Sequence, residues 1–398
     1  MNVANNVRDN YPSQRHASRF VRHEYHDADW QSGHFFRPAG SVGPDAQSES
    51  AATGSKITPL ALTLGQTGES ANLTRHYRLP LNFAAPITRW RLHIRNYNPR
   101  LGTVQTGVVN FTGLWIGKHA GNGAFTSTPR QLRGPFETAA EGSDCVSSWF
   151  NVPIGNGEYL LSFGYSATNA PVALVGGCWQ SADPTEAAVI SPTVGRTITA
   201  PFDIWIEAEI PASTHVVGML GDSLSCGVGS TLPVHDSTIS QYARTIGALP
   251  YHLAASGESM AGMLAVNAGK VTRWSGLANP DSILCAAGSN DIAAGDNFST
   301  LKTRYLDLAK VVFGLAPNVF LADIMPRHRW AVGGAQDATR RQYNKWLSTL
   351  PGGARGVFKF AASVSTDDVT IAPAYNADGT HLTTAGYARN ASAIAGLA

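Results

Sequence analysis

The stretch "VVGMLGDSLSCGVGS", Val216 to Ser230, contains an apolar run that ends abruptly at Gly-Asp-Ser-Leu and continues into small residues. The apolar run has the length of a buried strand, and Gly, Asp and Ser are common in turns. Ser223 therefore falls at the end of a strand, where a serine on a strand-to-helix turn can also act as a nucleophile. The rest of the sequence has to distinguish a turn serine from a reactive one.

The region after Pro211 has the pattern of an α/β domain. Short apolar runs without alternation, as expected for strands covered on both faces, lie at 215–220, 282–287 and 318–324. Asp323 interrupts the last of these runs. Helical patterns follow from Ser299, a predicted N-cap with Leu301, Tyr305, Leu308 and Val312 on one stripe, at 335–350 and after Thr384. Strands that alternate with helices predict a parallel, doubly wound sheet, in which ligands bind at the carboxyl ends of the strands.

The region from Lys56 to Ala212 has the pattern of an antiparallel β-domain. "RWRLHIR" (89–95) and "FDIWIEAEI" (202–210) alternate apolar and polar residues, which predicts strands with one buried face. Gly, Pro and Asn separate such runs, as in "NYNPRLG" (96–102), and indicate tight turns. A β-sandwich or jelly-roll domain fits this pattern best.

These patterns divide the chain into a polar N-terminal arm at 1–55, a β-sandwich domain at 56–212 and an α/β domain at 213–398. The arm contains His, Asp and Glu at 22–29, but no regular element is predicted there to hold metal ligands together, so we predict no metal site. The four cysteines, which fit no CxxC pattern, are Cys145, Cys178, Cys226 and Cys285. Buried thiols are the preferred interpretation, and a Cys145–Cys178 disulfide is the alternative.

Composition excludes some classes of partner. The net charge of +2 at pH 7 gives no electrostatic reason to expect a nucleic acid or an anionic membrane surface. No apolar run reaches the roughly 20 residues that a membrane-spanning helix needs. The N-terminus lacks the charged-then-apolar pattern of a secretory signal, so the sequence leaves an extracellular, a virion-associated and a cytoplasmic location open. A homo-oligomer or incorporation into a larger assembly also stays open.

A candidate catalytic constellation spans the α/β domain. A serine hydroxyl needs a base to take its proton, usually a histidine that a carboxylate orients. Asp378 and His381 lie three residues apart in "YNADGTHLTTAGYARNA", just before the last predicted helix. Donors to an oxyanion are expected at the ends of neighbouring strands, with Gly257 in "LAASGES" and Asn290 in "CAAGSND". Ser223, Asp378 and His381 thus form a candidate triad.

These segments resemble the motif blocks of the SGNH, or GDSL, hydrolase family. The matching blocks are Gly221-Asp222-Ser223-Leu224, Gly257, Gly288-Ser289-Asn290-Asp291 and Asp378-Gly379-Thr380-His381. The resemblance covers about residues 213–398 and implies a three-layer, flavodoxin-like α/β/α fold with a five-stranded parallel sheet.

The resemblance also implies roles for individual residues. Ser223 would be the nucleophile, His381 the general acid and base, and Asp378 the carboxylate that orients it. The oxyanion hole would consist of the backbone N–H groups of Ser223 and Gly257 and the side chain of Asn290. The reaction would need no metal and no organic cofactor.

Residues beside these blocks are expected to support the site. Asp222 and Asp291 are expected to brace loops rather than react, and Cys226 to pack in a helix that follows the nucleophile. The residues that follow the predicted fourth strand, and that are candidates to line a substrate cleft, are Arg327, His328 and Trp330.

We therefore predict a serine esterase that hydrolyses carboxylic esters through an acyl-enzyme. The predicted substrates are acetyl or other short acyl groups on a polysaccharide or glycan, an interpretation that rests on the β-domain. A lipase, a thioesterase or a general short-chain esterase is the alternative among enzymes. A structural or adhesive component, for instance of a virion tail or surface, with or without esterase activity, is the alternative from another class.

Overall fold

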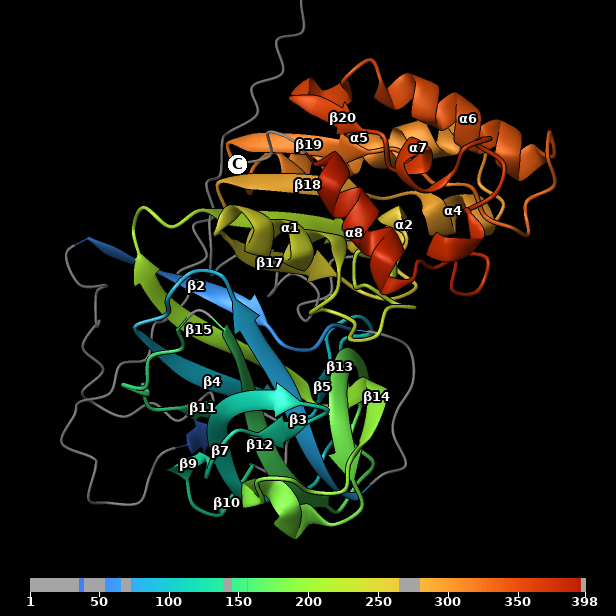
Figure 1. Cartoon of the computed structure of the whole chain (residues 1–398). Helices are drawn as coiled ribbons and strands as arrows, with labels where there is room; N and C mark the ends of the chain where they lie inside the picture. The colour runs from blue at the N-terminus through green and yellow to red at the C-terminus, as the bar shows by residue number, and fades with distance from the viewer. Residues whose placement is uncertain are drawn as a thin grey trace, which may run out of the picture.

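The structure is a computed structural model that describes residues 36–38, 54–65, 73–138, 145–155, 157–264 and 280–394. Two bodies lie next to each other, with the β-rich one in blue and green and the α/β one in yellow to red (Figure 1). The candidate group at 22–29 and most of the predicted arm fall outside the described residues.

The β-rich body, called the β-domain below, is built from antiparallel sheets. Its strands are β1 (Phe36–Pro38), β2 (Ser55–Ala61), β3 (Thr74–Phe83), β4 (Arg89–Arg95), β5 (Tyr97–Asn98), β6 (Thr103–Val104), β7 (Val109–Gly121), β8 (Ala124–Phe125), β9 (Arg130–Arg133), β10 (Phe136–Glu137), β11 (Cys145–Ser147), β12 (Gly157–Ala167), β13 (Ala173–Ser181), β14 (Gly195–Pro201) and β15 (Asp203–Pro211). One sheet has the order β1-β11-β4-β15-β2 and the other follows β10-β7-β12-β3-β13-β14. The sheets agree with the predicted β-sandwich, and the jelly-roll topology stays a prediction.

Strands β4 and β15 show why these sheets bury one core. Trp90, Leu92 and Ile94 of β4 are fully buried and pack with apolar residues of both sheets, as the alternation predicts. On the opposite face, three arginines of β4 pair with carboxylates of β15: Arg89 with Glu209, Arg91 with Glu207, and Arg95 with Asp203. This pairing allows the polar face to be largely buried as well.

The second body, called the α/β domain below, is a parallel sheet between two layers of helices. Its strands are β16 (Val216–Gly221), β17 (Leu249–Ala254), β18 (Ser282–Ala286), β19 (Asn318–Ala322) and β20 (Gly356–Phe358). The order β17-β16-β18-β19-β20, with every pair parallel, is the doubly wound order predicted for the α/β domain.

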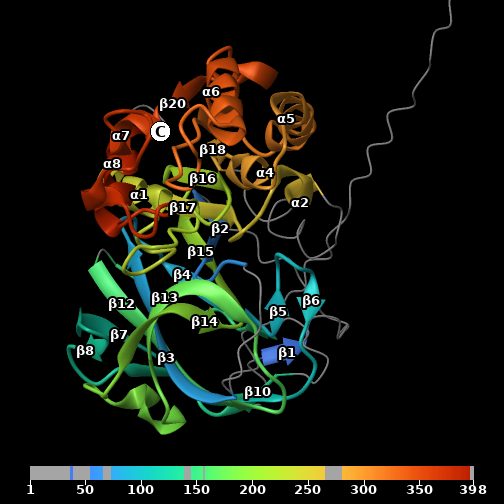
Figure 2. The same ribbon diagram turned by 90° about the vertical axis from the view of Figure 1, so that its right-hand side faces the viewer.

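The helices cover both faces of this sheet, as the two views in Figures 1 and 2 show. They are α1 (Thr238–Ile246), α2 (Met260–Leu264), α4 (Ser289–Ala293), α5 (Phe298–Val312), α6 (Ala335–Leu347), α7 (Phe360–Val364) and α8 (Thr384–Ala393). Alternate residues of β16 pack into different cores: Val217 and Met219 with α1, α7 and α8, and Leu220 with α5 and α6. None of the helices within the described ranges is long and apolar enough to cross a membrane.

Two local predictions need correction. Helix α5 begins at Phe298, because Asn297 accepts a hydrogen bond from the Thr300 N–H and is the N-cap in place of Ser299. The first helix after the nucleophile, α1, begins only at Thr238, so Cys226 lies in a series of turns and not in a helix.

The cysteines are buried, in line with the preferred interpretation. Cys178, on β13, is a free thiol that lies 3.4 Å from the Thr199 carbonyl oxygen, so the alternative Cys145–Cys178 disulfide is not formed. Cys226 lies between the two bodies, in a cluster with Leu64 and Val175 of the β-domain.

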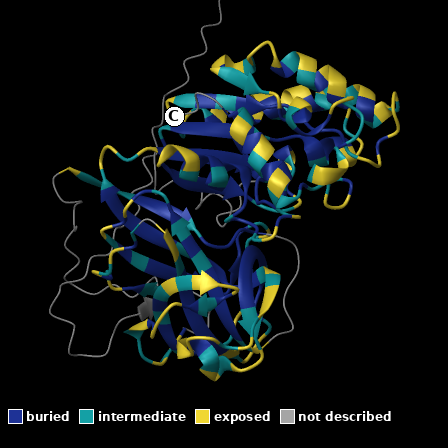
Figure 3. Cartoon of the chain, viewed as in Figure 1, coloured by how far each residue is buried: buried dark blue, intermediate teal, exposed yellow. Residues whose placement is uncertain are grey.

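The two bodies share a buried boundary. Figure 3 shows the strands on both sides of it as mostly buried. Gly65 forms a parallel bridge with Ala255, which follows β17, and the Ser256 N–H donates to the Gly65 carbonyl at 2.7 Å. The Gly177 N–H donates across the same boundary to the Pro233 carbonyl at 2.9 Å. The β-domain therefore contacts the α/β domain close to the carboxyl ends of its strands.

Candidate active site

The turn that holds Ser223 follows directly from the end of β16. A Cβ atom on Gly221 would lie 2.1 Å from the Ser225 hydroxyl and 2.6 Å from the Ala286 carbonyl, so only glycine fits at this position. The Asp222 carboxylate accepts the Leu224 N–H at 2.9 Å, which fixes the turn as predicted for a bracing residue. Ser223 is thus held at the carboxyl edge of the sheet, and the residue is 6 % exposed.

The structure brings the three predicted triad residues together. The Ser223 Oγ lies 2.9 Å from the His381 Nε2, and the His381 Nδ1 lies 2.7 Å from the Asp378 Oδ2. The other oxygen of Asp378 accepts the backbone N–H groups of Thr380 and His381 at 2.9 and 2.8 Å. The short turn between Asp378 and His381 therefore fixes the positions of the carboxylate and of the imidazole ring that the carboxylate contacts.

The charge on Asp378 follows from these contacts. Partial burial acts to raise the pKa of this carboxyl, but the hydrogen bonds from the His381 ring and from two backbone N–H groups outweigh it and lower the pKa to about 2. Asp378 is therefore a carboxylate at neutral pH, placed to stabilise a proton on the neighbouring imidazole.

Two backbone N–H groups near Ser223 are available as donors. Within the described residues, neither the Ser223 N–H nor the Gly257 N–H donates to a protein acceptor. Gly257 has a φ of +74°, a conformation that favours glycine, and lies in the turn after β17. Both N–H groups are thus without a protein acceptor in the described part of the chain, and their role as oxyanion donors stays a prediction.

Asn290 lies at the start of α4, where the residues after β18 enter the site. Its Nδ2 donates to the Glu258 carbonyl at 2.9 Å and lies 3.4 Å from an Asp222 carboxylate oxygen. Its Oδ1 accepts from Arg327 at 2.9 Å. Because the arginine occupies the amide oxygen, the NH₂ group is directed to Glu258 and Asp222, the sequence neighbours of Gly257 and Ser223.

The segment after β19 supports the site from one side. Arg327 also donates to the Ser289 hydroxyl at 3.0 Å and lies over the Trp330 ring, 5.3 Å from its centroid. The His328 N–H donates to the Gly379 carbonyl at 2.8 Å, which ties this segment to the loop that bears Asp378. Their predicted contact with substrate stays a prediction.

Other carboxylates near the motifs have separate partners. Asp291 accepts the Met260 N–H and an Arg304 guanidinium N–H, and so braces two loops as predicted. Asp367 accepts backbone N–H groups of its own turn, and Asp368 pairs with Arg340. Asp378 is the carboxylate of this region that contacts the His381 ring.

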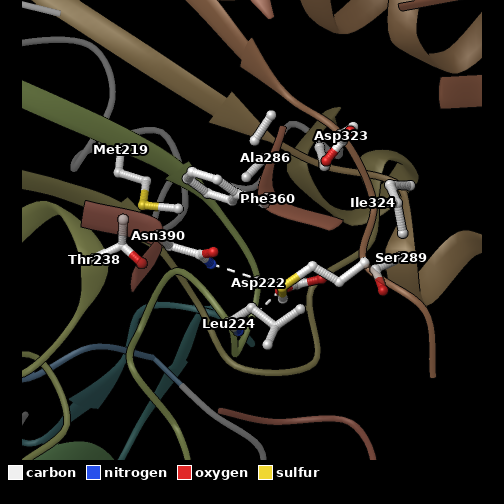
Figure 4. Close-up of a pocket in the computed structure, with 13 residues that line it drawn as sticks. Met219, Asp222, Leu224, Thr238, Ala286, Ser289, Asp323, Ile324, Phe360 and Asn390 are labelled. Atoms are coloured by element: carbon white, nitrogen blue, oxygen red, sulfur yellow. Dashed lines mark hydrogen bonds between the residues drawn. The ribbon is translucent and has the colours of Figure 1, made fainter. Parts of the chain in front are cut away.

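A small cavity of about 30 Å³ lies behind the nucleophile turn. Asp222, Ser289 and Asp323 contribute its polar lining, and Met219, Ile324 and Phe360 part of its apolar lining (Figure 4). Ser223 and His381 are not among the residues that line it.

No group of three or more His, Cys, Asp or Glu side chains within the described ranges could hold a metal ion.

The sequence reasoning missed Arg100 of the β-domain. Its guanidinium Nη2 donates to the Gly257 carbonyl at 2.8 Å, beside the candidate oxyanion donor. The only sequence signal was the turn pattern of "NYNPRLG", which indicates where the chain reverses but not which distant loop the turn contacts.

Comparison with known proteins agrees with the motif blocks. Residues 219–389 match the model of the GDSL-like Lipase/Acylhydrolase family. A search of curated proteins finds no match for the chain.

Several solved structures resemble the chain. One is a member of the lipolytic protein G-D-S-L family from Veillonella parvula, which is 17% identical in sequence. The match covers 45% of this chain and 96% of that protein, with a TM-score of 0.39. A family two carbohydrate esterase from Clostridium thermocellum, in complex with cellohexaose, is 14% identical and covers 84% of this chain and 96% of its own, with a TM-score of 0.38. Another from Cellvibrio japonicus is 13% identical and covers 85% and 96%, with a TM-score of 0.37. At these identities and TM-scores, the likenesses carry no argument about the substrate of this chain.

Proposed function

We propose, from the premise that residues 219–389 belong to the GDSL-like lipase/acylhydrolase family, that this chain is a serine esterase with Ser223 as its nucleophile. The observation that carries the proposal is the continuous chain of short contacts from the Ser223 Oγ through the His381 ring to the Asp378 carboxylate. A hydroxyl, an imidazole and a carboxylate in this order are the parts of a nucleophile with its base.

The chemistry runs through an acyl-enzyme. The Ser223 Oγ attacks the ester carbonyl carbon while the His381 Nε2 takes the hydroxyl proton, and Asp378 stabilises the imidazolium that forms. The negative oxygen of the tetrahedral intermediate accepts hydrogen bonds from the N–H groups of Ser223 and Gly257 and from the Asn290 side chain. The alcohol leaves with the proton from His381, and water then attacks the acyl-enzyme by the same route to release the acid.

The surroundings of Ser223 favour a short acyl group on a hydrophilic alcohol. A long acyl chain needs an apolar groove, whereas the side chains that contact the candidate oxyanion donors are polar: Arg327 at Asn290 and Arg100 at Gly257. We therefore propose acetyl or another short acyl group on a polysaccharide or glycan as the substrate.

The test compares initial rates on p-nitrophenyl acetate, butyrate, octanoate and palmitate, together with acetate release from acetylated xylan. The proposal predicts the highest kcat/KM on acetate and measurable acetate release, both absent in Ser223→Ala. A maximum at octanoate or palmitate would instead support a lipase. No turnover of any ester by folded wild type would favour a structural or adhesive role.

A further inference from the structure

One turn of the β-domain reaches the loop after β17 of the α/β domain. The turn follows β5, where the Asn98 side chain accepts the Arg100 N–H at 3.1 Å and the Asn98 carbonyl accepts the Gly102 N–H at 2.8 Å. These local bonds define the backbone from which the Arg100 side chain extends.

Arg100 ends at the candidate oxyanion-hole glycine. Its Nη2 donates to the Gly257 carbonyl at 2.8 Å, and its guanidinium carbon lies 3.3 Å from where a Cβ on Gly257 would be. The guanidinium therefore occupies the space beside Gly257. It also holds the peptide group between Gly257 and Glu258, to which the Gly257 carbonyl belongs.

A second β-domain group holds the peptide on the other side. The Ser256 N–H, which belongs to the peptide that joins Ala255 to Ser256, donates to the Gly65 carbonyl at 2.7 Å. The peptide group between Ser256 and Gly257, which carries the Gly257 N–H, lies between these two. Its orientation is thus determined from both sides by groups of the β-domain.

The two β-domain groups also contact each other. A Cβ on Gly65 would lie 2.8 Å from the Arg100 N and 3.2 Å from the Pro99 Cγ, so the backbone at 65 passes directly against the turn at 99–100. Gly65, Arg100 and the loop at 255–257 therefore pack as one unit across the boundary between the domains.

We propose that Arg100, together with the Gly65 carbonyl, is a positioning residue of the esterase that aims the Gly257 N–H at the oxyanion. This inference rests on the proposed function and assigns the β-domain a part in the reaction. Arg100 acts through Gly257 and does not itself take part in bond making. A small misplacement of a catalytic donor can reduce a rate by up to about 100-fold, so the arrangement is expected to affect turnover more than substrate binding.

The test uses Arg100→Met, Arg100→Lys and the matched control Lys56→Met. Methionine keeps an unbranched stem against Gly65 but removes the donor, and lysine restores one donor. Lys56 also pairs across the domain boundary, with Asp281 at 3.6 Å, but Asp281 precedes β18 and so lies at the end of the sheet opposite Ser223. The readouts are kcat and KM on p-nitrophenyl acetate and the second-order rate of phosphonylation by a fluorophosphonate.

We expect Arg100→Met to lower kcat and the phosphonylation rate together by about 10- to 100-fold, with KM within about 2-fold of wild type. Arg100→Lys should recover most of the loss, and Lys56→Met should stay within about 2-fold in both rates.

Wild-type rates in Arg100→Met would overturn the proposal. Equal losses in Arg100→Met and Lys56→Met would also overturn it, because they indicate an effect of domain docking alone. Arg100→Met could fail to fold, and Arg100→Lys then provides the test. A folded Arg100→Lys whose rates are about 10- to 100-fold below wild type would also overturn the proposal. A wild type that is neither labelled nor active is a separate result, because it contradicts the proposed function itself.

Discussion

Among the described residues of the α/β domain, Ser223 with His381 and Ser237 with His252 form serine–histidine pairs of nearly the same length in different surroundings. The Ser223 Oγ lies 2.9 Å from the His381 Nε2, and the Ser237 Oγ lies 3.0 Å from the His252 Nε2. The first pair is at the carboxyl edge of the sheet, while the second is buried where the start of α1 packs on β17. A short serine–histidine distance alone is therefore no evidence of a nucleophile.

The two pairs differ in what the second ring nitrogen of the histidine contacts and in the partners of the serine hydroxyl. The His381 Nδ1 contacts the Asp378 carboxylate, whereas the His252 Nδ1 has no hydrogen-bond partner among the described residues. Burial lowers the pKa of His252 to about 4, since no carboxylate compensates for the lost hydration. The Ser237 hydroxyl also donates to the Val234 carbonyl at 2.9 Å, which occupies its proton. Ser237 and His252 are therefore structural, and the comparison can be tested pair by pair.

The largest effect is expected when the serine of each pair, or the carboxylate behind His381, is changed. Ser223→Ala or Asp378→Asn should lower kcat by about 10⁴-fold or more, because the nucleophile or the orientation of its base is lost. Ser237→Ala should leave kcat within about 3-fold of wild type and lower the free energy of unfolding by about 1–2 kcal/mol, because a buried hydrogen-bond network is broken. Ester kinetics and urea unfolding of the three variants check this, and a loss of turnover in folded Ser237→Ala would undo the distinction.

The next largest effect concerns the candidate oxyanion donors beside the first pair. Asn290→Ala should lower kcat by about 10²–10³-fold, as expected for the loss of one oxyanion donor. Arg327→Met keeps Asn290 but frees its amide oxygen, so we expect a smaller loss of about 10-fold. Single-turnover kinetics measure both variants. An unchanged rate in Asn290→Ala would remove this side chain from the oxyanion hole.

The second pair should instead contribute to the pH dependence of stability. His252 has a pKa of about 4 in the folded chain against an ordinary value of 6.5, so it stabilises the fold above pH 6.5 and this contribution is lost as pH falls toward 4. At about 1.4 kcal/mol per pKa unit, the loss is on the order of 3 kcal/mol. Urea unfolding at pH 7 and pH 4.5 should show a loss that is smaller by about this amount in His252→Gln than in wild type. Some loss remains in the variant, because burial and the charge of Arg78 lower the pKa of His76 to about 3 in both proteins. An equal pH dependence in both proteins would mean that another group causes it.

The smallest effect is expected on the acid limb of the rate profile. Because the pKa of Asp378 is held at about 2, its carboxylate stays ionised, and we expect no protonation of Asp378 on the acid limb of kcat/KM. His252→Gln should leave the shape and position of this limb unchanged. A limb that moves in His252→Gln would show that the two histidines are coupled.

The sequence predicts the first pair well because its determinants are local. Asp378 and His381 lie in one turn, and Ser223 directly follows a recognisable buried strand. Gly257 was likewise predicted from a local motif block. Its φ of +74° explains why glycine is favoured at this position. Parallel strands then bring these segments to one edge of the sheet, so the α/β pattern predicts their proximity.

The sequence could not predict what comes from the other domain. Arg100 contacts a residue 157 positions away, and nothing in its own turn distinguishes it from the paired arginines of β4. The start of α5 was missed for a simpler reason, since Asn297 and Ser299 are both good N-cap residues and their order alone does not decide. Contacts across the domain boundary depend on how whole sheets pack, which no short pattern records.

The most direct test of the central claim is to label the folded wild-type protein with a fluorophosphonate and to locate the adduct by peptide mass spectrometry. The account predicts one adduct, on Ser223, and none on Ser237, because Ser223, unlike Ser237, contacts a histidine that a carboxylate contacts in turn. An adduct on Ser237 or on any serine other than Ser223, or no adduct on the folded wild type, would contradict it.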